Sequence, residues 1–448
     1  MSPSEPIYKS GPAVQLALAK TAGGLRPYAC YVLLVLVLGY IVNVMDRAVL
    51  AVLLESIKHE FALTDGQLGI LSGLAFAVFY ATLGIPIAAW ADRWNRRNVL
   101  VLAILVWSVA TACCGLASGF FLLLVARAGT ATGEAGGTPP SHALISDYFS
   151  RSHRATALAV YALGVPLGAA AGSYFGGYLN HHYGWRTAFI AIGLPGVIVA
   201  LLVLLTVREP ARGHAENPGA AADRRPAPAI AGVFRYLWQR TAFRHLCLAA
   251  GLHSVVWYAG SQLNASFFQR SHGMTSQEAG SWLAVMAGVG TAGTFLGGFL
   301  ADRLSVWRGD RRWYLWLPGI ATLAMVPFQF SSYLANAHVP LFVSFAIMTV
   351  LASFFFGPSF AMTQGLATLR MRAMATSILL LVQTLVGQGI GPFLAGEISE
   401  HLMPTHGKDS LRYALVAVGL VNLWAAFHYF RGARTLRADL EASERDSG

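Results

Sequence analysis

Long apolar stretches, separated by short polar or basic segments, recur along the whole chain. A helix needs about 20 mostly apolar residues to cross roughly 30 Å of hydrocarbon. The pattern therefore predicts an all-α polytopic membrane protein with twelve transmembrane helices, whose boundaries are defined to within a few residues. The expected spans of the first half are residues 28–54, 66–91, 98–118, 119–146, 155–180 and 186–207. Those of the second half are residues 242–268, 277–301, 313–333, 339–366, 373–396 and 411–430.

One polar segment separates the two sets of spans. Residues 208–240 are rich in Pro, Gly and Ala, a composition typical of linkers. We therefore expect two pseudo-symmetric six-helix bundles, one on each side of this segment. The predicted organisation is an N-terminal segment 1–27, a first bundle 28–207, the linker 208–240, a second bundle 241–430 and a C-terminal tail 431–448.

Composition and charge placement agree with this interpretation. Charged residues make up 12% of the chain and hydrophobic residues 55%, whereas soluble domains carry about 25% charged residues. Of the 32 Lys and Arg residues, 25 fall on the N-terminal segment, the linker, the tail and alternate loops, and 5 on the opposite loops. The positive-inside rule then predicts cytoplasmic termini, with the protein in the cell (inner) membrane. This distribution explains the net charge of +11 without a nucleic-acid partner.

The sequence shows no clear motif for metal binding, cofactor binding or enzyme catalysis. The four cysteines lie in apolar runs without ligand spacing, so we expect no metal site and no cofactor. No acid completes a nucleophilic arrangement with the adjacent Ser141 and His142. We expect a protein that is not an enzyme.

Four charged residues lie deep within the expected spans, all of them in the first half. Asp46 and Arg47 fall in the first span, and Arg127 and Glu134 in the fourth. A charge at mid-bilayer costs at least roughly 2.5–3.5 kcal/mol, so such groups usually face a cavity and a partner. We predict that Asp46 and Glu134 exchange protons and that Arg47 and Arg127 are their charge partners. Proton uptake would free an arginine to bind an anionic group of a substrate.

The second half offers an aromatic and polar lining in place of charge. Together with Asn43 of the first span, its predicted substrate-binding residues are Trp257, Tyr258, Asn264 and Gln364. A charged head in the first half and an apolar tail along the second would suit an amphiphile. For His253 in the seventh span, a packing role is the favoured interpretation over a titrating group in a cavity.

Two loop clusters resemble the signature of the major facilitator superfamily, Gly-x-x-x-Asp-Arg-x-x-Arg-Arg. The first cluster follows the second span and has Ala88 in place of the glycine. The related copy follows the eighth span. The resemblance implies the twelve-helix fold of that superfamily and a cytoplasmic gate in which Arg96 reaches Asp147. The gate residues that it implies are Asp92, Arg93, Arg96, Arg97, Asp147, Asp302 and Arg303.

A narrower resemblance rests on motifs between about residues 40 and 210. Asn43-x-x-Asp46-Arg47, and Gly133-Glu134-Ala135 followed by Ile145-Ser146-Asp147-Tyr148-Phe149, resemble the Spinster family. Members of that family are proton-linked lipid transporters, so the resemblance implies a bacterial homologue that carries a lysolipid or sphingolipid-like substrate.

The predicted function is proton-coupled secondary active transport of an amphipathic substrate by alternating access. Its expected partners are that substrate, protons and membrane lipids, and we expect a monomer. The alternatives are a proton-linked carrier or multidrug exporter of a small hydrophilic or aromatic solute and, less favoured, a membrane lipid-modifying enzyme or a receptor. Because one fold serves many substrates, the sequence leaves the choice open.

Overall fold

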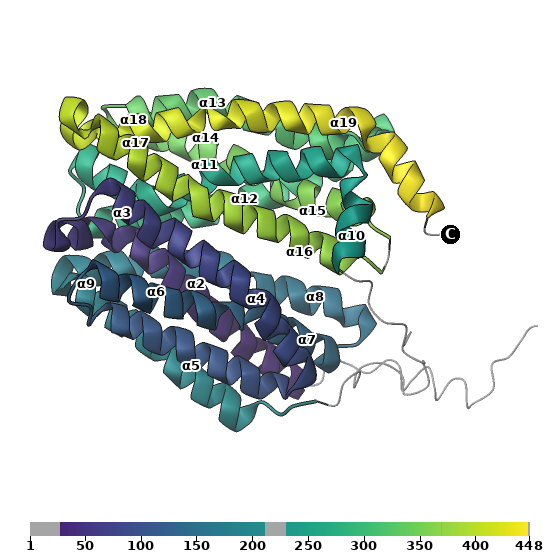
Figure 1. Ribbon diagram of the computed structural model, residues 1–448, viewed down its shortest axis with the longest axis horizontal. Coiled ribbons are helices and arrows are strands. Elements are labelled where there is room, and N and C mark those ends of the chain that lie inside the picture. Colours follow the sequence, from purple (N-terminus) through teal and green to yellow (C-terminus); the bar gives the residue numbers. More distant parts are fainter. Residues whose placement is uncertain (1–26, 211–229, 369, 447–448) are drawn as a thin grey trace, which may run out of the picture.

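The computed structural model describes residues 27–210, 230–368 and 370–446 (Figure 1). Residues 1–26 of the predicted N-terminal segment and residues 211–229 of the predicted linker lie outside these residues. The first half contains the helices α2 (Pro27–Phe61), α3 (Asp65–Gly69), α4 (Ala75–Arg93), α5 (Arg96–Cys114), α6 (Phe120–Ala135), α7 (Thr138–Tyr148), α8 (Arg151–Ala162) and α9 (Gly164–Thr206), with a π-helix η1 (Ile70–Leu74) joining α3 to α4.

The second half is built in the same way. It contains α10 (Ile230–Trp238), α11 (Thr241–His272), α12 (Ser276–Arg308), α13 (Trp313–Leu334), α14 (His338–Ser353), α15 (Phe356–Gly365), α16 (Arg372–Val382), α17 (Gly391–His406), α18 (Ser410–Gly419) and α19 (Val421–Arg445), with a π-helix η2 (Gln383–Ile390) and a short 3₁₀ turn η3 (Gly407–Asp409).

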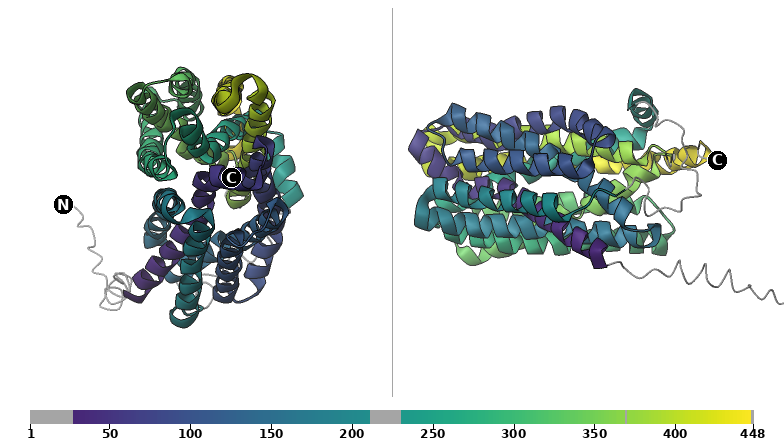
Figure 2. Two further views of the ribbon diagram at one scale, coloured as in Figure 1. Left: turned by 90° about the vertical axis from the view of Figure 1, so that its left-hand side faces the viewer. Right: turned by 90° about the horizontal axis from the view of Figure 1, so that it is seen from below.

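The helices gather into two bundles that lie side by side. Helices α2–α9 form the first bundle and α11–α19 the second, with the long helices of both running in roughly the same direction (Figures 1 and 2). The short helix α10 crosses this direction at one end of the molecule, and α3 lies at the other. These two ends are called the α10 end and the α3 end below.

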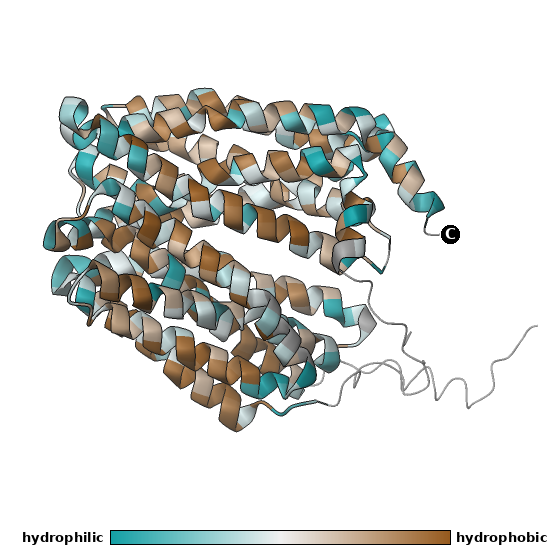
Figure 3. Ribbon diagram, viewed as in Figure 1, coloured by the Kyte–Doolittle hydropathy of each residue, from teal (hydrophilic) through white to brown (hydrophobic). Residues whose placement is uncertain are grey.

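The distribution of apolar residues fits a lipid environment. Hydrophobic residues cover the long helices, whereas hydrophilic residues gather towards the two ends (Figure 3). Seven helical stretches in the described part of the chain are long and apolar enough to cross a membrane. Two of these stretches contain a reversal of the chain, at Gly184 (φ 80°) and at Gly407 (φ 53°), where a left-handed backbone favours glycine. The prediction of twelve spans therefore stays a prediction.

Helical structure extends beyond the predicted boundaries of the second bundle. Helix α10 lies within the predicted linker, and α19 runs through residue 430 to Arg445. Asp439 in this extension accepts a hydrogen bond from the backbone N–H of Ala242 at 2.7 Å and thereby caps the first turn of α11. Residues 431–445 are thus packed as part of the second bundle.

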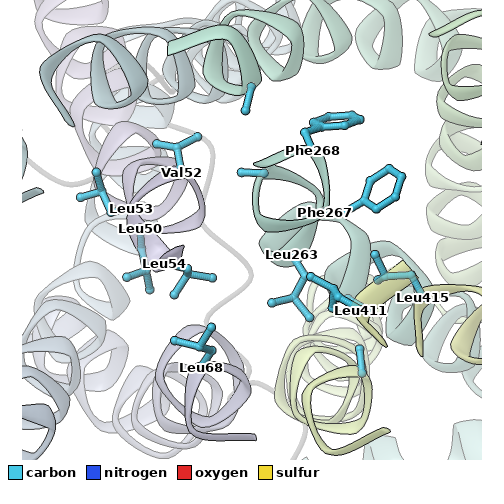
Figure 4. Packing of buried hydrophobic residues seen from close by; sticks show 14 of the residues in the cluster. Leu50, Val52, Leu53, Leu54, Leu68, Leu263, Phe267, Phe268, Leu411 and Leu415 are labelled. Atoms are coloured by element: carbon cyan, nitrogen blue, oxygen red, sulfur yellow. The ribbon is translucent and has the colours of Figure 1, made fainter. Parts of the chain in front are cut away.

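The bundles pack tightly against each other towards the α3 end. One apolar cluster spans both of them there and includes Leu50 of α2, Leu263 of α11 and Leu411 of α18 (Figure 4). Glycines let α9 and α12 approach closely: a Cβ atom on Gly177 would lie 2.4 Å from the carbonyl oxygen of Ser276. This packing joins the two bundles at that end.

Candidate functional site

Helices α2 and α6 place the four deep charges in one cluster. Arg47 donates from Nε to Oε2 of Glu134, and the two form an ion pair. Arg127 donates from Nη1 to the backbone oxygen of Asp46, at 3.4 Å. Asp46, Arg127 and Glu134 are almost completely buried, whereas the side chain of Arg47 is 30% exposed. Arg47 is thus the member of the cluster that solvent reaches.

An aromatic side chain from α4 lies between the two arginines. The guanidinium carbon of Arg47 lies 5.0 Å from the ring centre of Phe76, and that of Arg127 lies 5.6 Å from the same ring. Tyr80 lies one turn further along α4 and stacks on Phe76. Its ring centre also lies 5.0 Å from the guanidinium carbon of Arg47. Cation–π contacts of this kind contribute about 0.5–2 kcal/mol each. Neither ring could be predicted from the sequence, because nothing distinguishes them from other aromatic residues of an apolar span.

The carboxyl group of Asp46 occupies a different environment from that of Glu134. No described residue donates a hydrogen bond to either of its oxygens, although the Thr111 side chain lies nearby. Glu134 has one paired oxygen, since Oε1 lacks a partner and Oε2 binds Arg47. The two carboxyl groups of the cluster therefore differ in their hydrogen-bond partners.

Two of the predicted residues of the second bundle, Trp257 and Tyr258, are neighbours on α11. Tyr258 is half-buried. Its neighbour Trp257 is half-buried and packs edge to face on Phe356 of α15, with 5.5 Å between the ring centres. Asn43 lies on α2 one turn before Asp46, and its side-chain nitrogen is buried without a partner.

The other predicted residues of the second bundle have different partners. Asn264 accepts a hydrogen bond from Tyr333 at 2.9 Å within the buried core, and Gln364 is exposed near Thr376. In the described part of the chain, no hydrogen bond or ion pair joins either residue to the four charges. Both ring nitrogens of His253 are engaged, with the carbonyl oxygen of Ala352 and with Thr322, as expected for a packing histidine.

The predicted gate residues lie at the α10 end, and the contacts described for Arg96, Arg97 and Asp302 are each made within one bundle. Arg96 pairs with Asp147 and also with Glu209, at 2.9 Å, while the backbone N–H of Arg97 donates to Glu209. Asp302 accepts a hydrogen bond from Tyr314 at 2.6 Å within the second bundle. The side chains of Arg93 and Arg303 are exposed. The side chain of Asp92 lies outside the described part of the structure.

An ion-pair network at the α3 end crosses between the bundles. Arg270 of α11 donates to Glu55 of α2 at 2.6 Å and to both oxygens of Asp65 at 2.7 Å. Lys58 also pairs with Asp65, and Ser399 of α17 donates to it at 2.6 Å. Arg270, Glu55 and Asp65 are all less than one-tenth exposed. The sequence signal was present, since Lys58 and Arg270 are two of the few bases predicted on that side, but the pattern did not show that they meet.

Comparisons with known proteins define the class of this protein. The sequence profile of the Major Facilitator Superfamily matches residues 36–392. A solved bacterial homologue of the human lysosomal transporter Spinster, in an inward-facing and unoccupied conformation, aligns with a TM-score of 0.86 and 33% identity. The alignment covers 93% of this chain and 99% of that one. The same fold recurs in a D-xylose–proton symporter, with a TM-score of 0.69 and 14% identity.

Two curated relatives refine the comparison. An MFS-type efflux pump of Mycolicibacterium smegmatis is 31% identical over 89% of this chain and 91% of its own length. The sphingosine-1-phosphate transporter SPNS2 of Danio rerio is 28% identical over 53% of this chain and 48% of its own length. The chain belongs to the Spinster family of the major facilitator superfamily and is an integral membrane transporter, not an enzyme.

Proposed function

We propose that this protein is a proton-coupled transporter that moves an amphipathic anion, of the lysolipid or sphingolipid type, by alternating access. The observation that carries the proposal is the Arg47–Glu134 ion pair, in which the acid is buried and the base is partly exposed. An anionic headgroup that reaches Arg47 competes with Glu134 for the same guanidinium. Binding of the anion therefore favours protonation of Glu134, and protonation of Glu134 favours binding of the anion, as linkage requires.

The surroundings of Arg47 support an amphiphile. The ring centre of Tyr80 lies 5.0 Å from the guanidinium carbon of Arg47, so its hydroxyl group is close to where a headgroup would bind. Trp257 and Phe356, next to Tyr258 on the second bundle, offer aromatic surface for an apolar tail. A transporter for a sugar would instead need several hydrogen-bonding side chains around the ring of its substrate.

The arrangement of contacts supports an inward-facing conformation. The ion pairs and the glycine contacts that join the bundles lie towards the α3 end, whereas those of Arg96 and Asp302 at the α10 end stay within one bundle. From the positive-inside rule we infer that the protein lies in the inner membrane and that its α10 end faces the cytoplasm. The predicted gate residues would then form their contacts between bundles in the opposite state of the cycle.

A second candidate is export of a small aromatic or hydrophilic solute. The relative from M. smegmatis favours it, because its alignment spans nearly the whole chain and its name describes an efflux pump. The same cluster of charges could serve such a substrate. Competition between an anionic lipid and a small solute for binding at Arg47 would distinguish the lipid transporter from the solute exporter.

Transport into liposomes tests the proposal directly. The protein is reconstituted under an imposed pH gradient and offered lysophospholipids, sphingoid phosphates, hexuronates and aromatic solutes. We expect the gradient to accelerate movement of the anionic lipids, and Glu134→Gln or Asp46→Asn to remove that acceleration. The exposed tail residue provides a matched control, Glu441→Gln. Gradient-independent flux, or full activity of the double variant, would overturn proton coupling, and movement of the small solutes alone would overturn the lipid assignment.

A further inference from the structure

A cleft of about 490 Å³ lies at the α3 end, between α9 of the first bundle and α12 of the second. Sites for small molecules usually measure about 300–1,000 Å³. Neither the four deep charges nor Arg270 is among the described residues that line this cleft. Its lining includes one residue of α9, His181, and five of α12, namely Gln277, Glu278, Ser281, Trp282 and Val285.

The face of α12 that lines the cleft changes from polar to apolar along its length. Glu278, Ser281, Trp282 and Val285 follow one another at intervals of three, one and three residues, which places them on one side of a helix. At 1.5 Å of rise per residue, Val285 lies about 10 Å further from the α3 end than Glu278. Hydrophilic residues gather at that end and hydrophobic ones cover the helices beyond it (Figure 3). This order matches that of a lipid headgroup and its acyl chain.

The polar part of the cleft can bind an ammonium group. Oε2 of Glu278 accepts hydrogen bonds from the backbone N–H and the hydroxyl of Thr275, at 2.8 and 3.0 Å. In the described part of the chain, no group donates a hydrogen bond to Oε1 of the same carboxylate, and a charged donor would bind there strongly. Trp282 lies one turn further along α12 and stacks on Phe342 of α14, with 3.5 Å between the ring centres. An indole held in this way also attracts a cation.

The same part of the cleft holds donors for a phosphate group. Oε1 of Gln277 accepts a hydrogen bond from Nε2 of His182 at 3.2 Å, and its amide nitrogen has no described acceptor. His181 is exposed on the facing wall and offers a ring N–H. Donors on one side and a free carboxylate oxygen on the other are the groups that a zwitterionic headgroup requires.

We propose that this cleft binds a phospholipid whose headgroup carries a free amine, of the phosphoethanolamine type, from the leaflet on the α3 side. Glu278 and Trp282 would hold the ammonium group, and His181 and Gln277 the phosphate. The occupant is a lipid and not a soluble amine, because Val285 at the apolar end of the cleft is 58% exposed on a helix of spanning length and would lie among acyl chains.

The position of the cleft has a consequence for the transport cycle. Its walls belong to different bundles, which the hydrogen bond from His182 to Gln277 joins beside it. Opening of the α3 end would separate α9 from α12 and divide the site. A ligand that binds only one of two conformations shifts the equilibrium towards it, so the lipid would favour the closed α3 end. Neither the site nor this effect depends on which substrate is transported.

Native mass spectrometry of the full chain, delipidated in detergent, tests the site. Phosphatidylethanolamine, its N-acetylated form and phosphatidylglycerol are compared with equal acyl chains. We expect the free amine to bind about tenfold more tightly than the other two. Glu278→Gln should remove this preference, while it keeps an acceptor for the cap of α12. Glu397→Gln, an exposed acid at the same end, is the matched control. Equal affinities for the three lipids, or a preference that persists in Glu278→Gln, would overturn the site.

A second variant and a soluble competitor complete this test. If Glu278→Gln does not fold, Val285→Trp narrows the cleft from an exposed position and should weaken binding of the amine lipid by about tenfold. An unchanged affinity in that variant would also overturn the site. Glycerophosphoethanolamine, which has the same headgroup without acyl chains, should compete only weakly. Competition as tight as that of the lipid would overturn the lipid as the occupant.

Spin labels on the two bundles at the α3 end test the effect on conformation. The distance between them is measured in nanodiscs of phosphatidylglycerol, with and without phosphatidylethanolamine. We expect the amine lipid to increase the population with the short distance in the wild type and in Glu397→Gln, but not in Glu278→Gln. Distances that do not respond to the lipid in the wild type would overturn this effect.

Discussion

Arg270 of the second bundle and Glu55 of the first are in direct contact, with 2.6 Å between Nη2 and Oε1. The same guanidinium binds Asp65, so one base of the second bundle holds two acids of the first. All three side chains are less than one-tenth exposed. Any motion that separates the bundles at the α3 end must break these contacts.

Replacing this base should favour opening of the α3 end. Removing one partner of a buried ion pair costs about 3–5 kcal/mol, because the remaining charges stay buried without compensation. Arg270→Gln is therefore expected to lengthen the distance between spin labels placed on the two bundles at that end, as measured by electron spin resonance. Arg412→Gln is the matched control, since Arg412 is also buried at that end but pairs with Asp409 and Asn336 of its own bundle. Equal distances between the spin labels in Arg270→Gln and in the wild type would contradict the inference that these ion pairs hold the α3 end closed.

The ring between the two arginines should matter for transport more than for stability. Phe76→Leu keeps an apolar side chain but removes two cation–π contacts, which contribute about 1–4 kcal/mol together. We expect gradient-driven transport to fall about tenfold with little change in melting temperature. Phe79→Leu on the same helix is the control, because Phe79 is 41% exposed. A similar loss in both variants would assign the effect to helix packing.

Close approach of α9 and α12 depends on glycine. A Cβ atom on Gly280 would lie 2.3 Å from the carbonyl oxygen of Ser173, which is a backbone atom and cannot move aside alone. Gly280→Ala should therefore separate the helices and destabilise this conformation by about 1–3 kcal/mol, seen as a melting temperature lower by about 3 °C or more. Gly288→Ala on the same helix provides the control, since no atom lies within 4 Å of its added Cβ. Equal melting temperatures of the two variants would contradict this account.

The loop between α12 and α13 should give a defined acid dependence of stability. Hydrogen bonds from Arg312 and Arg437 lower the pKa of Asp310 from its ordinary value of 3.8 to about 2. Since the folded pKa is the lower one, ionised Asp310 stabilises the fold above about pH 4, and this contribution is lost as the pH falls towards 2. The difference in melting temperature between the wild type and Asp310→Asn should accordingly shrink between pH 4 and pH 2. Glu444→Gln, which removes an exposed pair with Arg311, should show no such trend.

Several features of this protein could be predicted from the order of residues alone. Apolar stretches of spanning length predict a helical membrane protein, because hydrocarbon leaves every backbone polar group to be satisfied within the helix. The deep charges Asp46, Arg47, Arg127 and Glu134 stood out for a similar reason, since a charge in lipid is too costly to occur without a partner. Their number and signs already indicated that they pair, and the structure gathers them in one cluster.

Only the tertiary structure decided which partners meet. It places Phe76 between two arginines, joins Arg270 to Glu55 across the bundles, and engages Asn264 with Tyr333 in the core. These pairs are separated along the chain by tens to hundreds of residues, so they depend on how each helix is rotated and on which helices are neighbours. Within an apolar span every face of a helix is hydrophobic, and the sequence periodicity therefore carries little information about that rotation.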